Sequence, residues 1–355
     1  MKKGIAAVFT CTIILVAFGA CLSTVGQPSP ISAKIGIFYY AWYNPDWPIS
    51  WDTTKIVDTP VLGYYNSCDP ATIRQHLIWI QDLGIDFVVI SWWGFYDDYG
   101  KFTDNAAKQA FETAANISST LKIAIMVEPF NKTGSSYDFN GICDHIYENF
   151  VALYPFLYYY NGNKPMICFF NNQSLTDNGT IPLNDERFNA IIVGQQSYAD
   201  WIYTDLNPYE YRALGQNQTS VTPRYDESHI PDRTGNATVD VYLNESVYNK
   251  EWMDATQLFR NQRITTILIS TWNEFPERTA IEPHNDSTAV NQDPYFLYNI
   301  TRDYVTQIRQ QNPSPSPTIP EYNHSLAATA AILTTISISA VSKRIRKNKS
   351  KTEKF

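Results

Sequence analysis

Short apolar segments alternate with longer amphipathic segments from about residue 35 to residue 310. The apolar segments have the composition of strands buried on both faces, because several are nearly continuous runs of β-branched and other apolar residues. The amphipathic segments between them have helical periodicity. Strands of this kind, each followed by a helix, form parallel sheets whose faces are covered. The alternation therefore predicts an α/β fold with a parallel sheet.

The length of this region favours one large domain, residues 27–311, over two smaller ones. A TIM-type (β/α)8 barrel fits this length best. A doubly wound open sheet is the alternative, but no Gly-rich phosphate loop follows any expected strand. The expected strands are Ile35–Tyr40, Phe87–Ser91, Lys122–Val127, Met166–Phe170, Ala190–Val193, Thr219–Thr222 and Ile264–Ile269. The expected helices are Pro70–Leu83, Asp104–Ala115, Tyr137–Tyr154, Tyr248–Asn261 and Pro294–Gln310.

The first 26 residues have the features of a secretory signal peptide. Lys2 and Lys3 precede an uncharged apolar run from Gly4 to Ala20, and small or polar residues follow as far as Gly26. An uncleaved signal anchor is the alternative interpretation. In either case, the sequence predicts that the chain enters the secretory route.

The C-terminal end has the features of a membrane anchor. A Pro-rich segment, residues 312–324, predicts a stiff spacer. Residues 325–342 carry no charge, and as a helix they extend roughly 27 Å, just under the hydrocarbon thickness of a membrane. The basic tail, residues 343–355, is expected on the cytoplasmic side. A soluble amphipathic helix is the alternative. These features predict a single-pass cell-membrane protein with its catalytic domain extracellular or lumenal.

The remaining composition limits the partners. The formal net charge of −8 argues against nucleic acid and suits a neutral substrate. Cys68, Cys143 and Cys168 allow at most one disulfide within the chain, and their spacing matches no metal motif, so we expect no metal and no cofactor. Ten Asn-x-Ser/Thr sequons agree with export: Asn116, Asn131, Asn172, Asn178, Asn217, Asn236, Asn244, Asn285, Asn299 and Asn323.

Aromatic and acidic residues follow the expected strands, where a barrel places its functional groups. Aromatic rings stack on sugar rings, and carboxylates supply acid, base and hydroxyl recognition. This pattern predicts a carbohydrate site. The candidate substrate-binding residues are Tyr39, Tyr40, Trp42, His76, Trp92, Trp93, Glu128, Trp272, Asn273 and Glu282.

Glu274 and Glu277 are the candidate catalytic residues. Two carboxylates three residues apart, at an apolar strand end, are costly to bury without partners. Their repulsion raises the pKa of one of them, as an acid/base pair requires. Other interpretations remain open for their neighbours: the tryptophans can simply fill the top of the barrel, Glu128 can be an ion-pair partner, and the position of His76 in an expected helix favours a structural role.

Four ordered segments resemble glycoside hydrolase family 99, the endo-α-mannosidase family. The fourth is similar to the family's Asn-Glu-Trp-His-Glu-Gly-Thr-x-Ile-Glu-Pro signature, which is specific. The segments are Phe38-Tyr39-Tyr40-Ala41-Trp42-Tyr43, residues 76–93 with His76, Gly84-Ile85-Asp86 and Ser91-Trp92-Trp93, residues 123–130 ending in Glu128-Pro129-Phe130, and residues 272–283 from Trp272-Asn273-Glu274 to Ile281-Glu282-Pro283.

The resemblance implies a (β/α)8 barrel and a retaining mechanism with an epoxide-like intermediate. By position, Glu274 matches the glutamate that deprotonates the sugar's 2-hydroxyl. Glu277 matches the one that protonates the leaving oxygen and later activates water. The resemblance also implies that Glu128 and His76 line the substrate pocket, which keeps both interpretations of His76 open.

Beside the catalytic pair, Pro276 replaces the signature's His and Arg278 replaces its Gly. We expect their bulk and charge to alter the shape of the subsites. The favoured function is an exported, endo-acting, α-mannoside-like glycoside hydrolase. The alternatives are a glycan-building or transglycosylating relative and a non-catalytic glycan-binding surface protein.

Overall fold

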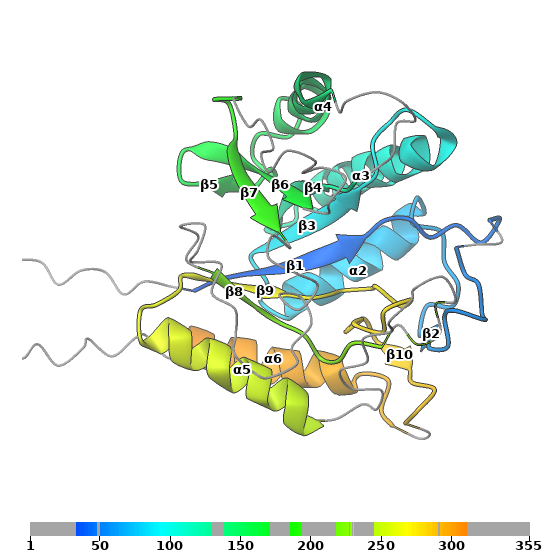
Figure 1. Cartoon of the computed structure of the whole chain (residues 1–355), viewed down its shortest axis with the longest axis vertical. Coiled ribbons are helices and arrows are strands. Elements are labelled where there is room, and N and C mark those ends of the chain that lie inside the picture. Colours follow the sequence, from blue (N-terminus) through cyan, green and yellow to red (C-terminus); the bar gives the residue numbers. More distant parts are fainter. Residues whose placement is uncertain are drawn as a thin grey trace, which may run out of the picture. The chain divides into compact units, whose positions relative to one another are not determined.

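Seven parallel strands form a curled sheet in the described part of the chain (Figure 1). The first strand, β1, pairs with both the second, β3, and the last, β9, an arrangement that a closed barrel also requires. The order across the sheet is β7-β6-β4-β3-β1-β9-β8. The bounds are β1 (Lys34–Tyr40), β3 (Phe87–Trp92), β4 (Lys122–Val127), β6 (Lys164–Phe170), β7 (Asn189–Val193), β8 (Gln218–Val221) and β9 (Thr266–Ile269).

The computed structural model describes residues 33–47, 50–129, 138–170, 185–193, 218–226, 228, 230, 245–289 and 292–310. These fall within one structural unit, Met1–Asn312. The expected signal peptide, spacer, membrane helix and basic tail lie outside the described residues. An α/β fold with a curled parallel sheet is confirmed, whereas the segment between β7 and β8 that would complete an eight-stranded barrel is not among the described residues. No helix in the described ranges is both long and apolar enough to cross a membrane.

The helices begin and end where side chains or glycines stop them. In α2 (Pro70–Asp82), the Asp69 carboxylate accepts hydrogen bonds from the first turn. Gly84 follows the helix with a φ of 77°, in the left-handed region that glycine adopts readily. The expected helix at Asp104 begins six residues earlier, as α3 (Asp98–Asn116), because Asp97 caps it by accepting from the Gly100 amide at 2.7 Å. The others are α4 (Phe139–Ile146), its π-helical continuation η1 (Tyr147–Val151), α5 (Glu245–Arg260) and α6 (Phe296–Gln310).

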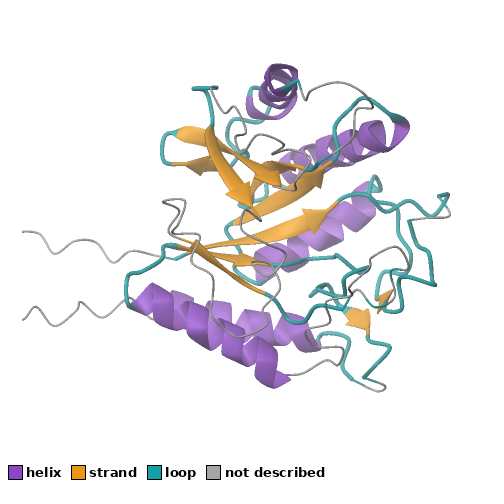
Figure 2. Ribbon diagram, in the orientation of Figure 1, coloured by secondary structure: helices purple, strands orange, loops and turns teal. Residues whose placement is uncertain are grey.

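Two cores form because successive strand residues face opposite sides of the sheet. Val88 and Ile90 of β3 pack against the helices on the outer side of the curl. Phe87 and Val89 point to the inner side, where they join residues of the other strands. Figure 2 shows the helices arranged around the strands. Three short strands complete the described elements: β5 (Tyr160–Asn161) pairs with β6, and β2 (Thr59–Pro60) pairs with β10 (His284–Asn285).

This two-residue alternation sorts the aromatic residues at the end of β1. Tyr39 belongs to the outer core, among the helices, and Tyr40 to the inner core. Cys68, Cys143 and Cys168 all carry free thiols. The fold therefore places the carboxyl ends of β1, β3, β4 and β9 side by side, which brings the candidate residues of four distant segments to one edge.

Candidate functional site

The charges of three carboxyl groups act on the hydroxyl of Tyr40, at the carboxyl ends of the strands. The pKa of Tyr40 is raised well above its ordinary value, first by burial and then by the negative charges of Glu274, Glu128 and Glu277, with a hydrogen bond to Glu274 adding to the effect. All three acids therefore act on one point. The structure brings the expected catalytic pair and Glu128 together.

Glu274 is held at the edge of the sheet by its own backbone. Its amide donates to the Thr271 hydroxyl at 3.0 Å, and its side chain is buried. Glu277, three residues on, is half-buried. One carboxyl of the pair is thus enclosed and the other lies nearer to solvent, an asymmetry that suits two different roles in proton transfer.

Glu128 follows β4 directly and is protonated over most of the neutral range. Burial raises its pKa to about 8; the hydrogen bond from the Ser91 hydroxyl opposes this shift and the charge of Glu277 adds to it. The Ser91 hydroxyl donates to Glu128 at 2.8 Å and accepts from the Trp93 indole at 3.2 Å. None of the described cationic side chains forms an ion pair with Glu128, so the geometry does not support the ion-pair interpretation.

Aromatic side chains line this edge of the sheet. Trp42 lies between Tyr40 and Trp93, with ring centroids 4.5 and 6.1 Å away. Trp93 makes an edge contact with Tyr99 at 5.6 Å. Trp42 and Trp93 are only partly buried, so part of each side chain remains available for a sugar to contact.

Tyr99 is a site residue that the sequence interpretation missed. Its pKa is raised by burial and then by Glu128 and Glu274, so its hydroxyl lies near both carboxyls. It sits in the first turn of α3, five residues before Asp104, where the sequence predicted the helix to begin. The Asp97 cap two residues earlier was the available signal, because it places the helix start at the strand edge.

Tyr39, His76 and Glu282 lie behind the edge and not on it. The Tyr39 hydroxyl is 3.0 Å from His76 Nδ1, and His76 Nε2 is 3.1 Å from Glu282 Oε1. Tyr65 donates to the other Glu282 oxygen at 2.7 Å. The side chains of His76 and Glu282 have no solvent exposure. His76 lies in α2, and with both ring nitrogens engaged its placement favours the structural interpretation.

Asn273 ties β1 to the segment after β9. Its side-chain amide exchanges two hydrogen bonds with the Tyr40 backbone, at 2.7 and 2.8 Å. Tyr43 donates to the Asn273 carbonyl at 2.7 Å and accepts from the Phe275 amide at 3.2 Å. The residues on both sides of Glu274 are therefore held, Asn273 by β1 and Phe275 by Tyr43, which follows β1. Asn273 thus supports the site and does not face it.

Trp92 and Trp272 belong to the core between sheet and helices, and neither is exposed. The Trp92 indole donates to Asp104 at 3.0 Å, on the helix side of the sheet. Both rings therefore fill the core between the sheet and the helices and do not reach the site. Of the aromatic candidates, Tyr40, Trp42 and Trp93 remain at the site.

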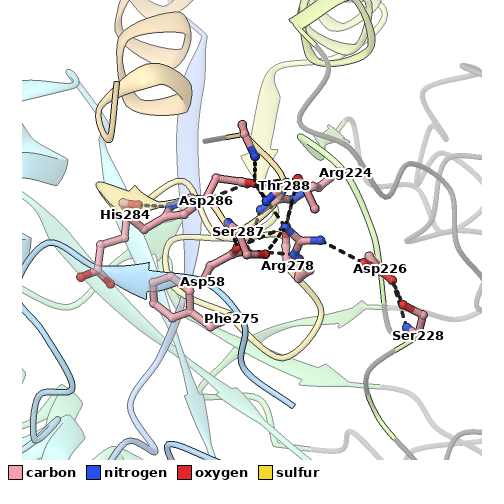
Figure 3. A network of polar contacts seen from close by, with 12 residues as sticks. Asp58, Arg224, Asp226, Ser228, Phe275, Arg278, His284, Asp286, Ser287 and Thr288 are labelled. Atoms are coloured by element: carbon pink, nitrogen blue, oxygen red, sulfur yellow. Dashed lines mark hydrogen bonds and ion pairs between the residues drawn. The ribbon is translucent and has the colours of Figure 1, made fainter. Parts of the chain in front are cut away.

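Arg278 does not place its charge at the site, contrary to the expectation from the sequence. Its side chain is buried and turns into a polar network with Asp58, Asp226 and Asp286 (Figure 3). Arg224, which follows β8, pairs with Asp58 at 2.8 Å and also with Asp286. Burial alone would raise the pKa of Asp58, but the two arginines hold it below its ordinary value.

The same network contains a set of possible metal ligands. Atoms of Asp58, His284 and Asp286 lie within 4.8 Å of one another. Both aspartates already form ion pairs with guanidinium groups, which a divalent cation would have to displace. The described residues therefore form an internal ion-pair network at this position and give no support to a metal centre.

Comparisons with known proteins agree with the geometry. The sequence model of Glycosyl hydrolase family 99 matches residues 49–179, a range that ends before Glu274. A glycoprotein endo-alpha-1,2-mannosidase-like protein of Mus musculus is 23% identical over 261 residues, which cover 63% of this chain and 57% of that protein. The glycoprotein endo-alpha-1,2-mannosidase of Xenopus laevis is 25% identical over 184 residues, 42% of this chain and 40% of that protein.

A solved structure has a similar fold. The family-99 endo-alpha-mannosidase of Bacteroides thetaiotaomicron matches with a TM-score of 0.58 at 20% identity, covering 78% of this chain and 97% of that one. At this identity the likeness concerns the fold. The chain spans somewhat over half the length of the mouse relative, 57%.

Proposed function

Since the chain belongs to glycoside hydrolase family 99, we propose that it cleaves glycosidic bonds in an oligosaccharide or polysaccharide. One observation carries the proposal: Glu128, Glu274 and Glu277 act together on the Tyr40 hydroxyl, beside the partly exposed rings of Trp42 and Trp93. Carboxyls and flat aromatic surfaces at one edge are the groups that glycoside cleavage needs. The names of the relatives support an endo-acting enzyme for α-mannosides.

The proposed mechanism gives the two glutamates separate tasks. Glu274, enclosed against Tyr40, takes the proton of the sugar's own 2-hydroxyl, whose oxygen then attacks the anomeric carbon. Glu277, nearer to solvent, protonates the departing oxygen and later activates the water that opens the intermediate. Glu128, protonated near neutral pH, donates a hydrogen bond to a substrate hydroxyl. Both displacements occur at one carbon, so the anomeric configuration is retained.

We also propose that the curled sheet is part of a complete (β/α)8 barrel. The pairing of β1 with β9 supports closure, because the first and last strands already meet. The domain is proposed to be exported and tethered by residues 325–342. The apolar ends of the sequence and the sequons support this, and Asn116, the first sequon, is exposed at the end of α3.

A screen of glycans tests the proposed reaction. The full chain is incubated with α-mannosides and other oligosaccharides, and NMR follows the anomeric configuration of the first product. We expect a retained α-product, and far slower reaction of these glycans with the Glu274→Gln and Glu277→Gln variants. Binding without products would favour the glycan-binding alternative, and longer oligosaccharides would favour transglycosylation.

Fractionation tests the proposed tether. The full chain should sediment with membranes until detergent is added, and a chain lacking residues 321–355 should be soluble and active. Recovery of the full chain in the soluble fraction without detergent would contradict the tether and leave the hydrolase proposal untouched.

A further inference from the structure

The turn that carries Glu277 has a backbone conformation that its own residue types do not favour. Arg278 has a φ of 58°, in the left-handed region that glycine adopts readily and that a residue with a Cβ avoids. Its amide donates back to the Phe275 carbonyl at 3.1 Å, which closes the turn around Pro276 and Glu277. Something outside the turn must hold Arg278 in this conformation.

The contacts of the Arg278 side chain stabilise this backbone conformation (Figure 3). Nε is 2.9 Å from one Asp58 oxygen and a terminal nitrogen is 3.1 Å from the other, so the guanidinium engages Asp58 with two prongs. The other terminal nitrogen is 3.1 Å from Asp226. The side chains of Arg278 and Asp226 are fully buried and that of Asp58 is nearly so, which leaves the guanidinium little freedom to move.

The segment after β8 forms hydrogen bonds with the backbone of the same turn. The Asp226 amide donates to the Glu277 carbonyl at 3.0 Å. The Arg224 side chain donates from Nε to the Arg278 carbonyl at 2.8 Å, while its terminal nitrogen holds Asp58 at 2.8 Å. Two successive carbonyls, those of Glu277 and Arg278, are thus fixed to the segment after β8, and both arginines meet at Asp58.

We propose that Arg278 and Arg224 are positioning residues that fix the backbone of Glu277 relative to Glu274. Neither touches the substrate edge, because both side chains are buried in the network. They act through Glu277: by holding its peptide, they set where its carboxyl meets the departing oxygen. The inference rests on the proposed function, and it has a physical basis because small displacements of a proton donor cost large factors in rate.

The test uses a charge-balanced variant, Arg278→Gly with Asp226→Asn. Glycine accepts the positive φ, the paired removal of one cation and one anion leaves the network's charge unchanged, and the Asp226→Asn change keeps the backbone amide. Its kcat and KM are measured on two α-mannosides with the same sugar, one with a methyl and one with a dinitrophenyl leaving group. Arg278→Lys, which keeps the charge but loses the two-pronged contact, is measured beside it.

We expect the double variant to lose between about 10- and 100-fold in kcat on the methyl glycoside, with KM little changed. The dinitrophenyl glycoside hardly needs protonation and should lose much less. Arg278→Lys should lie between wild type and the double variant. A purely structural role predicts equal losses on both substrates; that result, or no loss on the methyl glycoside, would overturn the inference.

Amide hydrogen exchange separates this inference from the proposed function. The peptide covering residues 274–280 should exchange faster in the double variant, while β4, residues 122–127, should exchange at the wild-type rate. Unchanged exchange at 274–280 overturns the inference whatever the activity. If the wild-type chain cleaves no glycoside but the exchange result holds, the proposed function alone has failed and the hold on the turn stands.

Discussion

Glu277 and Arg278 are consecutive residues, but their side chains belong to two groups of carboxyls with different surroundings. Glu277 belongs to the cluster with Glu274 and Glu128, where burial and mutual repulsion raise the pKa of Glu128 to about 8. Arg278 belongs to the network with Asp58, where two guanidinium groups hold the pKa of the aspartate below its ordinary value. In the first group, one carboxyl keeps its proton near neutral pH; in the second, the guanidinium groups favour the charged form of the aspartate.

The comparison teaches how one turn can serve both chemistry and stability. Glu277 acts on Tyr40 and Glu128, whereas the side chain of Arg278 enters the network with Asp58. The ion-pair network stabilises the turn, and the carboxyl cluster uses the position so fixed. Variants of the two groups should therefore give different kinds of loss.

The largest expected effect comes from a change in the substrate and not in the protein. Replacing the 2-hydroxyl of an activated glycoside by fluorine removes the proposed nucleophile, so we expect no turnover and no mass increase of the protein. A conventional retaining enzyme would instead be slowed and trapped as a covalent ester, with its two carboxyls about 5–5.5 Å apart. Intact-mass spectrometry decides between them. A stable adduct on Glu274 would exclude the participation mechanism and leave the hydrolase proposal standing.

Glu277→Gln should give the next largest effect. If Glu277 protonates the leaving oxygen, kcat/KM on natural glycosides should fall by about 10²- to 10⁴-fold. For a dinitrophenyl glycoside kcat/KM, which reports only the first step, should fall much less, and this substrate serves as the internal control. Steady-state kinetics on both substrates provide the measurement. Equal losses would mean that Glu277 is not the acid, and that the carboxyl cluster differs from the proposed arrangement.

Asp58→Asn tests the other side of the comparison. It removes the buried carboxylate that Arg224 and Arg278 share, so each guanidinium loses one of its ion pairs. We expect the free energy of unfolding to fall by about 3–5 kcal/mol, measured by urea denaturation. Asp98→Asn is the matched control, because Asp98 pairs with Lys101 on an exposed surface and such pairs contribute little. Similar small changes in both variants would show that the network does not stabilise the turn.

The sequence predicted the strands best where the chain marks both of their ends. The bounds of β4 agree with the expected Lys122–Val127, because an apolar run stops at Glu128-Pro129. The expected helix at Asp104 began too late, since Asp97 caps α3 ahead of a polar stretch that resembles a loop. Tyr99 was missed for the same reason: a side chain in that stretch reaches the site only once the helix start is known.

The sequence predicted candidate site residues but not the layers in which they lie. The structure brings Glu274, Glu277 and Glu128 together, yet sequence spacing did not separate the partly exposed Trp93 from the buried Trp92 beside it. The ion-pair network was out of reach because Asp58 meets Arg224 and Arg278 from 166 and 220 residues away. Pairing at such separations depends on the packing of the sheet, which local pattern does not specify.

The smallest expected effect is a difference in the pH dependence of stability. Glu128 has a pKa of about 8 when folded, against an ordinary value of 4.5, so between these values the folded chain keeps a proton that the unfolded chain releases. Its contribution to stability is therefore lost as pH rises from 4.5 to 8 and is constant above that range. Asp58 has the opposite sign, because its lowered pKa makes stability fall as acid protonates it. Glu128→Gln removes the first effect and keeps the volume of the side chain. We expect the variant to match wild type near pH 4.5 and to exceed it by a few kcal/mol at pH 8, measured by urea denaturation at both values. A constant difference at the two pH values would show that Glu128 ionises normally in the folded chain, and the contrast between the two carboxyl groups would then lose its basis.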